Sequence, residues 1–504
     1  MSRRLSFLAS FILLLFVIVA AQSAYVQYFH ASALAQSAEN PRNNTVSSSQ
    51  PRGEIVGADG TILADSLPVG ASGKIFQREY PLGSLTAGVV GFVAPALAGA
   101  TWGLEEQYNS VLTAHAQPAQ NFEQVLAPTT AADNVQTTIY PALQKIAAAA
   151  MTGRDGAAVV IQPQTGAIMA MYSNPTYEPE YLASPSYNTA LAYYTKYTQK
   201  NANGFPPLGL IATQQTFPPG STFKVITTAA AAKYKPGLLS KSYPKLPFYT
   251  PPMTTSKLYN DGHYPCGGTV QEMLPASCDP GYAHLGVDIG AVDLSKMSNA
   301  FGYNSVPPID LPFTRPIVSS AIFPAAKTFT YNIPYLAYSA IGQANVRSTA
   351  LQQALVAAGI ANGGTIMTPH LMQSIVGPDG TKISTYQDSV WKKPLTSAQA
   401  GIIVPLMQKV VTNGTASGIF LPQDNVAAKT GTAQERGLTQ TDDWMIAFAP
   451  ANNPTVAVAV MMPYQPKSFY GATVAGPIVK CLIEGALAIQ AGQPSTGTST
   501  TCPS

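Results

Sequence analysis

The stretch "PPGSTFK", residues 218–224, puts a serine where a helix is expected to begin and a lysine one turn further on. Residues three apart lie on the same face of a helix, so Ser221 and Lys224 would be neighbours. A serine hydroxyl needs an adjacent base to act as a nucleophile, and a lysine serves as that base only where burial or a nearby cation lowers its pKa. The helix N-terminus would favour a developing oxyanion. The stretch therefore predicts a serine nucleophile with a lysine base.

An isolated Ser-x-x-Lys pair is a weak signal, and the chain contains two more. They are "SYPK" (residues 242–245), whose Pro244 argues against a regular helical turn, and "SVWK" (residues 389–392). A chance surface pair is the ordinary explanation of any single copy. A histidine base has no support either, because no Gly-x-Ser-x-Gly elbow contains Ser221 and no histidine has an evident triad context. Ser221 is distinguished by what stands elsewhere in the chain.

Two other stretches complete a set. "AAKTGTAQ" (residues 427–434) is expected to be a strand in which Gly431 permits the close approach of another backbone and the lysine offers a cation for a carboxylate. "ASCDPGYAHLG" (residues 276–286) has Ser277 two residues before Asp279. Ser-x-x-Lys, Ser-Asp-Asn and Lys-Thr-Gly, in this order, form the signature of penicillin-binding proteins and class A β-lactamases.

Length and composition indicate a large folded protein and argue against a nucleic-acid partner. The 504 residues are enough for two or three folded units. Hydrophobic residues make up 46% of the chain and charged residues 11%, so an extensive core can be buried. The net charge of +3 is too close to zero to support a nucleic-acid partner.

The N-terminus has the pattern of a membrane anchor. Two arginines precede an uncharged apolar run over residues 5–21, apolar residues resume at 25–29, and the next Lys or Arg is Arg42. This asymmetry predicts one transmembrane helix within residues 1–29, with the N-terminus in the cytoplasm and the rest of the chain outside. Small residues near Ala20 and Ala24 could be a cleavage site, so a cleaved signal peptide is the alternative interpretation.

After the anchor, the composition changes along the chain in a way that predicts three further regions. Residues 30–150 begin with a polar linker and continue as short apolar pieces broken by Gly and Pro, which indicates a β-containing module without a nucleophile or cofactor loop. Residues 151–491 form a larger unit. Residues 492–504 are rich in Ser and Thr and are expected to be disordered.

The larger unit has strand patterns at both ends and helical patterns between them. The expected strands are a hairpin over residues 157–173 and two more at 444–449 and 455–462, and the expected helices are 221–233, 348–361 and 477–489. Strand pairs that enclose helices in this way favour an α+β fold. We predict an antiparallel sheet, flanked by helices, that is assembled from distant parts of the chain.

With these motifs the chain resembles a class B penicillin-binding protein, the monofunctional transpeptidase of peptidoglycan synthesis, and in particular the actinobacterial penicillin-binding protein A group. The resemblance extends to "RGEIVGADGTILA" (residues 52–64), "REYPLGSLTAGVVGF" (78–92) and "GLEEQYNSVL" (103–112) in the N-terminal part. In the larger unit it extends to "IGQANVRSTALQQALVAAGIANGGTIMTPHL" (341–371) and "DDWMIAFAP" (442–450). It thus covers most of residues 40–490.

The resemblance implies a penicillin-binding, serine β-lactamase-like transpeptidase fold in residues 151–491 and a non-catalytic pedestal or dimerisation-like module in residues 30–150. It makes Ser221 the acylated nucleophile and Lys224 its base. Ser277 would relay a proton towards the leaving group or the incoming amine. The implied substrate is the D-Ala-D-Ala end of a peptidoglycan stem peptide, and β-lactams would acylate the same serine.

The resemblance also implies how the substrate is held. Lys429, Thr430 and Thr432, together with Gly431, would bind the substrate carboxylate, and the backbone N–H groups of Ser221 and Thr432 would form the oxyanion hole. No metal or organic cofactor is needed. The expected partners are stem peptides, β-lactams, the cytoplasmic membrane and other wall-synthesis or division proteins, with D,D-carboxypeptidase action as a side activity.

Asp279 departs from the family pattern, which normally has asparagine there. An ionised aspartate cannot donate the hydrogen bond that an amide donates, and its charge would favour protonated Lys224 and weaken the base. A raised carboxyl pKa that keeps Asp279 neutral would restore the role. The alternative function is therefore a catalytically weakened scaffold of the cell-wall or division machinery.

Two cysteines near the middle motif raise a separate question. Cys266 and Cys278, with His263 and His284, have spacings loosely like those of a zinc site. The exported location and the motif position of Cys278 favour a disulfide that would tether the Ser277 loop. Two free buried thiols are the third possibility.

Overall fold

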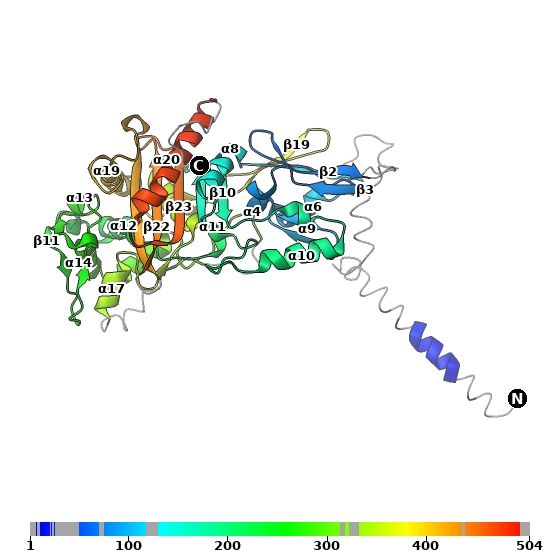
Figure 1. Ribbon diagram of the computed structural model, residues 1–504, viewed down its shortest axis with the longest axis horizontal. Coiled ribbons are helices and arrows are strands. Elements are labelled where there is room, and N and C mark those ends of the chain that lie inside the picture. Colours follow the sequence, from blue (N-terminus) through cyan, green and yellow to red (C-terminus); the bar gives the residue numbers. More distant parts are fainter. Residues whose placement is uncertain are drawn as a thin grey trace.

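The computed structural model describes residues 7, 11–20, 22, 25, 50–69, 75–116, 130–312, 318–321, 332–435 and 439–493. Figure 1 shows two units side by side, with the N-terminal module around β2 and β3 at one end and the larger unit around β22 and α12 at the other. The predicted polar linker, apart from its last residues, and the predicted tail from residue 494 onwards lie outside the described residues.

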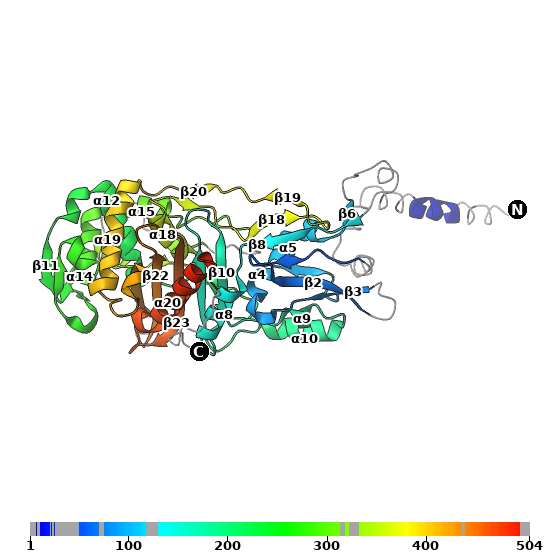
Figure 2. The ribbon, with the colours of Figure 1, turned by 90° about the horizontal axis from the view of Figure 1, so that it is seen from above.

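The N-terminal module is built on a six-stranded sheet in the order β19-β18-β8-β1-β2-β3. Its strands are β1 (Ile55–Val56), β2 (Ile62–Val69), β3 (Ile75–Glu79), β8 (Asn134–Thr137), β18 (Met372–Val376) and β19 (Lys382–Thr385). A turn at Asp59-Gly60 joins β1 to β2, and Gly60 has a φ of +84°, which glycine adopts without strain. Figure 2 shows β18 and β19 running from the larger unit into this sheet.

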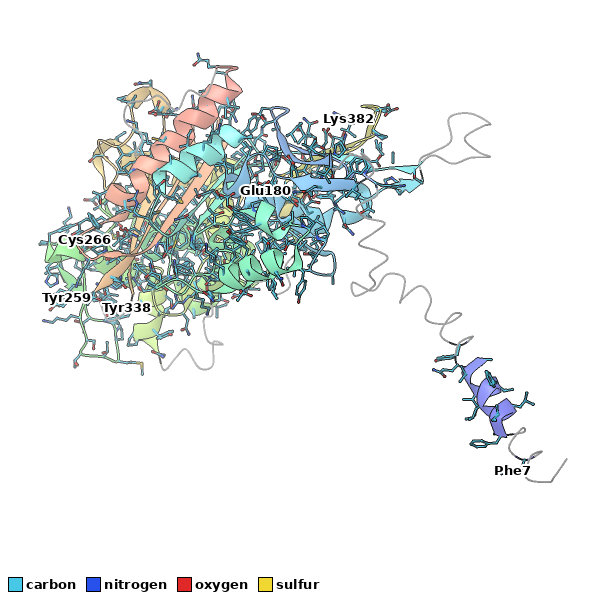
Figure 3. The ribbon with its side chains drawn as sticks, turned by 45° about the vertical axis from the view of Figure 1, so that its right-hand side comes forward. Phe7, Glu180, Tyr259, Cys266, Tyr338 and Lys382 are labelled. Atoms are coloured by element: carbon cyan, nitrogen blue, oxygen red, sulfur yellow. A yellow bond between two sulfur atoms is a disulfide. The ribbon has the colours of Figure 1, made fainter. Side chains whose placement is uncertain are left out.

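One carboxylate ties the two units together where β18 begins. Asp310 accepts hydrogen bonds from the Leu371 and Met372 N–H groups at 2.7 and 2.8 Å, and from the Tyr108 hydroxyl of the N-terminal module at 2.8 Å. In Figure 3, Lys382 on β19 lies at the opposite end of the molecule from Tyr259 and Cys266. The hairpin β18–β19 therefore reaches well away from the helical end of the larger unit.

The larger unit contains the predicted antiparallel sheet, with five strands in the order β10-β9-β23-β22-β21. They are β9 (Gly156–Ile161), β10 (Ile168–Asn174), β21 (Ala427–Glu435), β22 (Gln440–Ala449) and β23 (Val456–Pro466). β9 pairs with β23, with Val159 opposite Ala459, so the sheet joins the start of the unit to its end. Every residue of β9 is buried, because helices cover both faces of the sheet. The predicted α+β fold is confirmed.

Helices cover both faces of this sheet. α20 (Gly471–Gln490) lies beside α8 (Pro141–Ala150), and α18 (Ala350–Ala361) packs on β9 and β23 from the other side (Figure 2). α18 is buried nearly throughout, as expected of a helix that is apolar on all sides. The prediction that the last helix begins at Pro477 is wrong. The helix begins at Gly471. A Cβ added to Gly471 would lie 2.3 Å from Trp444 O, so the start of the helix packs tightly on β22.

The described residues include one helix that is long and apolar enough to cross a membrane, namely α20, but 56% of its apolar window is buried inside the fold. That is the behaviour of a core helix. Of the predicted anchor, residues 11–20 are described as a helix whose apolar side chains, including Phe11 and Phe16, are exposed. Figure 3 shows Phe7 on this segment, apart from both units.

The two other Ser-x-x-Lys pairs are not helical. "SYPK" enters β11 (Tyr243–Leu246), as its proline predicted, and "SVWK" enters β20 (Val390–Lys392). In a strand, successive side chains alternate between faces, so residues three apart point in opposite directions. Neither pair can bring its lysine beside its serine.

Candidate active site

Ser221 lies in a 3-10 turn, Gly220–Phe223, that continues directly into α12 (Lys224–Tyr234). Gly220 has a φ of +52° and donates its N–H to Gly342 O at 3.0 Å. The carbonyl of Pro218 accepts a hydrogen bond of 2.9 Å from the Trp444 indole on β22. The turn is thus fixed to the central sheet on one side and to the 342 loop on the other, and Ser221 remains partly exposed.

Lys224 is fully buried, one turn behind Ser221. Its Nζ lies 2.7 Å from Asp279 Oδ1, 2.5 Å from the Ser277 carbonyl and 3.4 Å from the Ser277 hydroxyl. Burial lowers the pKa of Lys224, and the Asp279 carboxylate opposes that effect only in part. Lys224 donates to Ser277 and Asp279, and no described residue, Lys224 included, hydrogen-bonds the Ser221 hydroxyl. This side chain is therefore free to turn towards the amine.

Ser277 lies in the short loop that leads to α14 (Asp279–Ile289), with a φ of +54° that is unusual for serine. Several bonds hold this loop, and three of them lie at Cys278 and Asp279. The Cys278 N–H donates to Met273 O at 3.0 Å, a disulfide joins Cys278 to Cys266, and the Asp279 N–H donates to the Asn260 side chain at 3.1 Å. The surroundings therefore over-determine the strained backbone at Ser277.

Lys429 approaches Ser277 from the opposite side, from β21. Its fully buried amine donates to the Ser277 hydroxyl at 2.8 Å and to Thr430 O at 3.0 Å. Burial lowers the pKa of Lys429 well below the ordinary lysine value, the charge of Lys224 lowers it further, and Asp279 opposes both. An anion bound beside Lys429 would favour its charged form.

The remaining residues of the third motif line the same edge of the sheet. A Cβ on Gly431 would lie 2.7 Å from Pro219 O, so only glycine lets β21 approach the Ser221 turn this closely. The Thr430 hydroxyl lies 2.6 Å from the Thr415 hydroxyl, and the Thr432 hydroxyl accepts the Gly471 N–H at 3.1 Å. The structure therefore brings all three predicted motifs to one place.

The zinc alternative does not fit the geometry. Cys266 and Cys278 are bonded to each other and are not available as thiolate ligands. The His284 ring stacks on Tyr249 with centroids 4.7 Å apart, and the His263 ring stacks on Tyr259 at 4.5 Å. Across the described parts of the chain, no cluster of three or more His, Cys, Asp or Glu residues could hold a metal ion.

Two contributors to the site were missed in the sequence. Asn260 is buried and holds the start of α14 by accepting the Asp279 N–H. The Trp444 indole anchors the approach to Ser221. The only local signal for Asn260 is an Asn-Asp-Gly turn pattern, which does not indicate its distant partner. Trp444 lies in a stretch that resembled the family, but the resemblance assigned it no role.

Both units match known protein families. Residues 156–484 match the family model of the penicillin binding protein transpeptidase domain, and residues 52–137 match that of the penicillin binding protein A dimerisation domain. The chain is 35% identical to the peptidoglycan D,D-transpeptidase PbpA of Mycolicibacterium smegmatis, over 94% of this chain and 97% of the relative.

Solved structures show the same fold. The crystal structure of PBPA from Mycobacterium tuberculosis superposes with a TM-score of 0.77 at 33% identity, covering 87% of this chain and all of the other. The penicillin G acyl-enzyme complex of that protein gives the same TM-score, identity and coverage. The transpeptidase match spans well over half of the chain, and the identity to the mycobacterial relative extends over nearly its full length. The chain therefore belongs to the penicillin-binding protein transpeptidase family.

Proposed function

We propose that the protein is a peptidoglycan D,D-transpeptidase, which cross-links stem peptides through an acyl-enzyme at Ser221 and is acylated there by β-lactams. One observation carries the proposal. The amines of Lys224 and Lys429 both reach the Ser277 hydroxyl, at 3.4 and 2.8 Å, beside the turn that presents Ser221. Ser221 supplies a nucleophile for acyl transfer, and Lys224 supplies a base of lowered pKa. The Ser277 hydroxyl, between the two amines, can pass a proton.

In the first half-reaction, the Ser221 Oγ attacks the carbonyl carbon of the D-Ala-D-Ala bond. The hydroxyl proton passes to neutral Lys224, a C–O bond forms and the C–N bond breaks. The leaving amine takes a proton that Lys224 delivers through Ser277, and D-alanine departs. In the second half-reaction, the amine of a neighbouring stem peptide attacks the ester carbonyl and gives a proton to Lys224. The new C–N bond forms, the C–O bond to Ser221 breaks, and Lys224 returns the proton to the Ser221 oxygen.

Substrate positioning is assigned to β21. Lys429, Thr430 and Thr432 bind the terminal carboxylate, and the backbone N–H groups of Ser221 and Thr432 stabilise the oxyanion. Each such donor contributes about 3–4 kcal/mol in other enzymes. The close contact between Gly431 and the Ser221 turn supports this assignment, because it holds β21 against the turn that carries Ser221.

Replacing Gly431 by alanine should slow acylation about 100-fold. The new Cβ would lie 2.7 Å from Pro219 O and 2.9 Å from Thr222 Cγ2, so β21 and the Ser221 turn must separate. A displacement of about 1 Å at a reacting centre can cost a factor of about 100. Stopped-flow measurement of the second-order acylation rate with a fluorescent penicillin checks this. Gly401→Ala is the matched control, because nothing lies within 4 Å of its added Cβ, and it should react at the wild-type rate.

The N-terminal segment is proposed as a membrane anchor that leaves the enzyme outside the cytoplasm. The exposed apolar side chains of residues 11–20 support this, together with the arginines that precede them in the sequence. Other wall-synthesis or division proteins are proposed as partners.

The alternative, a catalytically weakened scaffold, depends on Asp279 alone. If Asp279 is ionised, it raises the pKa of the base. Asp279→Asn should then move the acid limb of the acylation profile to lower pH by about one unit, because Lys224 must lose its proton to act and loses it more easily without the carboxylate. At pH 7 acylation should be about tenfold faster. Rates measured from about pH 5 to pH 9 decide the matter, and an unmoved acid limb would show that Asp279 does not weaken the base.

The direct test is to locate the covalent bond. The full chain in detergent is incubated with penicillin G, digested and analysed by mass spectrometry, and D-alanine release is followed with a D-Ala-D-Ala peptide. We expect one penicilloyl group on the peptide that contains Ser221 and measurable D-alanine release. A folded protein that carries no adduct would favour the scaffold.

A further inference from the structure

Asp443 is a buried carboxyl that the proposed mechanism does not use. It lies on β22, next to Trp444, and is fully buried. Neither of its two oxygens makes a hydrogen bond of normal length and angle to a described residue, although the Thr432 and Thr441 hydroxyls lie close enough to interact with the carboxyl. A carboxyl group in this position costs free energy, since it has lost water and gained only these weak contacts. Asp443 therefore keeps a costly carboxyl on the strand that neighbours β21, which carries the third motif.

Asp443 is directly opposite Thr432 across the β21–β22 ladder. Paired residues on neighbouring strands have their side chains on the same face, with Cβ atoms about 5 Å apart. The Thr432 and Thr441 hydroxyls are near enough to lower the pKa of Asp443, but burial outweighs them and raises it to about 7. The carboxyl is therefore poised to change charge near neutral pH.

No charged neighbour accounts for this shift. The described titratable or charged side chains of the elements around Asp443 are Lys429 on β21, Asp442 on β22, Tyr464 on β23, and Lys480 and Glu484 on α20. None of them is among the causes of the Asp443 shift. The charge state of Asp443 is thus controlled by burial and by the two threonine hydroxyls.

The hydroxyl of Thr432 can make one donor bond and accept two. The Gly471 N–H already occupies one acceptor position, at 3.1 Å. If Asp443 is neutral, its O–H can fill the second acceptor position, and the Thr432 proton remains available for a substrate carboxylate. If Asp443 is ionised, it can only accept, and it draws that proton away from the substrate. The ionised form also repels an anionic substrate through a medium of low dielectric.

We propose that Asp443 is a positioning residue that acts through the Thr432 hydroxyl and makes recognition of an anionic substrate weaken as the pH rises above neutral. The inference rests on the proposed function, since it takes Thr432 as a ligand of the substrate carboxylate. It adds an alkaline limit to binding that is separate from the acid limit set by Lys224.

The test compares Asp443→Asn with wild type in the acylation of the full chain by penicillin G. Saturation kinetics separate the non-covalent binding constant from the acylation step. In wild type, binding should weaken about tenfold between about pH 6 and pH 8.5, the equivalent of one pKa unit of coupling, while the acylation step keeps its own profile. In Asp443→Asn, binding should fall much less over this range, because only the titration of Lys429 remains. Asp442→Asn is the matched control. The Asp442 carboxylate accepts the Tyr464 N–H at 3.2 Å, and the variant should keep the wild-type fall.

Two further measurements keep the test decisive. The methyl ester of penicillin G has no carboxylate, so its binding to wild type should be independent of pH even if the variant fails to fold. Thermal unfolding reports the titration itself. A carboxyl pKa that is raised in the folded state is destabilising once the pH rises through the window from about 4 to about 7, so the melting temperature of wild type should fall relative to Asp443→Asn over that window.

An equal fall in binding for Asp443→Asn and wild type would overturn the inference, as would an equal fall for the ester and the acid. Absence of any adduct in wild type at every pH would instead overturn the proposed function.

Discussion

The Ser221→Ala variant is expected to fold like wild type and to form no covalent adduct with any β-lactam. The loss of reaction should be complete, because alanine has no oxygen with which to form the ester. Folding should survive, since no described residue hydrogen-bonds the Ser221 hydroxyl and the turn is held by the backbone of Gly220 and Pro218. A substitution of this kind is usually within about 0.5 kcal/mol of wild type in stability.

Gel fluorescence with a fluorescent penicillin measures this result, and thermal unfolding verifies the fold. Ser389→Ala is the matched control, because it removes the serine of a Ser-x-x-Lys pair that enters a strand. It should label at the wild-type rate. Labelling of Ser221→Ala would show that another side chain is acylated.

The Lys224→Met variant should acylate about 100- to 10,000-fold more slowly than wild type, which is the usual contribution of general acid–base catalysis. Methionine retains most of the buried side-chain volume and removes the amine that contacts Asp279 and Ser277. Wild-type acylation should also rise with pH as Lys224 loses its proton, at a pH below the ordinary lysine pKa of about 10.4, because burial lowers the pKa of Lys224.

Lys224→Arg separates a base from a simple cation. Arginine keeps a positive charge at this position but is not deprotonated in proteins. The Lys224→Arg variant should acylate as slowly as Lys224→Met, and its acylation rate should not rise with pH. A Lys224→Arg rate close to that of wild type would mean that the side chain acts through its charge, and the base would have to be sought elsewhere. Stopped-flow acylation rates over the same pH range distinguish these outcomes.

The sequence alone predicts those contacts of the site that join residues close together in the chain. The spacing of Ser221 and Lys224 needs only one helical turn, and Pro244 was enough to set aside one competing pair. The convergence of Ser277 and Lys429 on this turn has no such local basis. It was expected from the resemblance to a family, because the three motifs are separated by long stretches of chain.

The contacts that could not be predicted join residues that are far apart in the chain, and the sequence does not show which residues meet. The Asn260 side chain meets the Asp279 N–H because β13 (Leu258–Tyr259), which directly precedes Asn260, packs on α14. Asp443 was noticed only within a stretch that resembled the family. An acid in a buried apolar strand is costly and thus informative, but its effect on Thr432 requires the register of β21 against β22. The early start of α20 likewise follows from packing against β22, which overrides the usual position of proline in the first helical turn.

The hairpin β18–β19 has a practical consequence for any attempt to isolate the catalytic half of this protein. β18 is sandwiched between β8 and β19, and β8 belongs to the N-terminal half of the sequence. A fragment that starts after α8 would keep β18 but lose β8, leaving a row of unsatisfied N–H and C=O groups open to other chains. Such a fragment should self-associate along that edge. The N-terminal module thus covers this edge of β18, so we expect a fragment that stays monomeric to include both units.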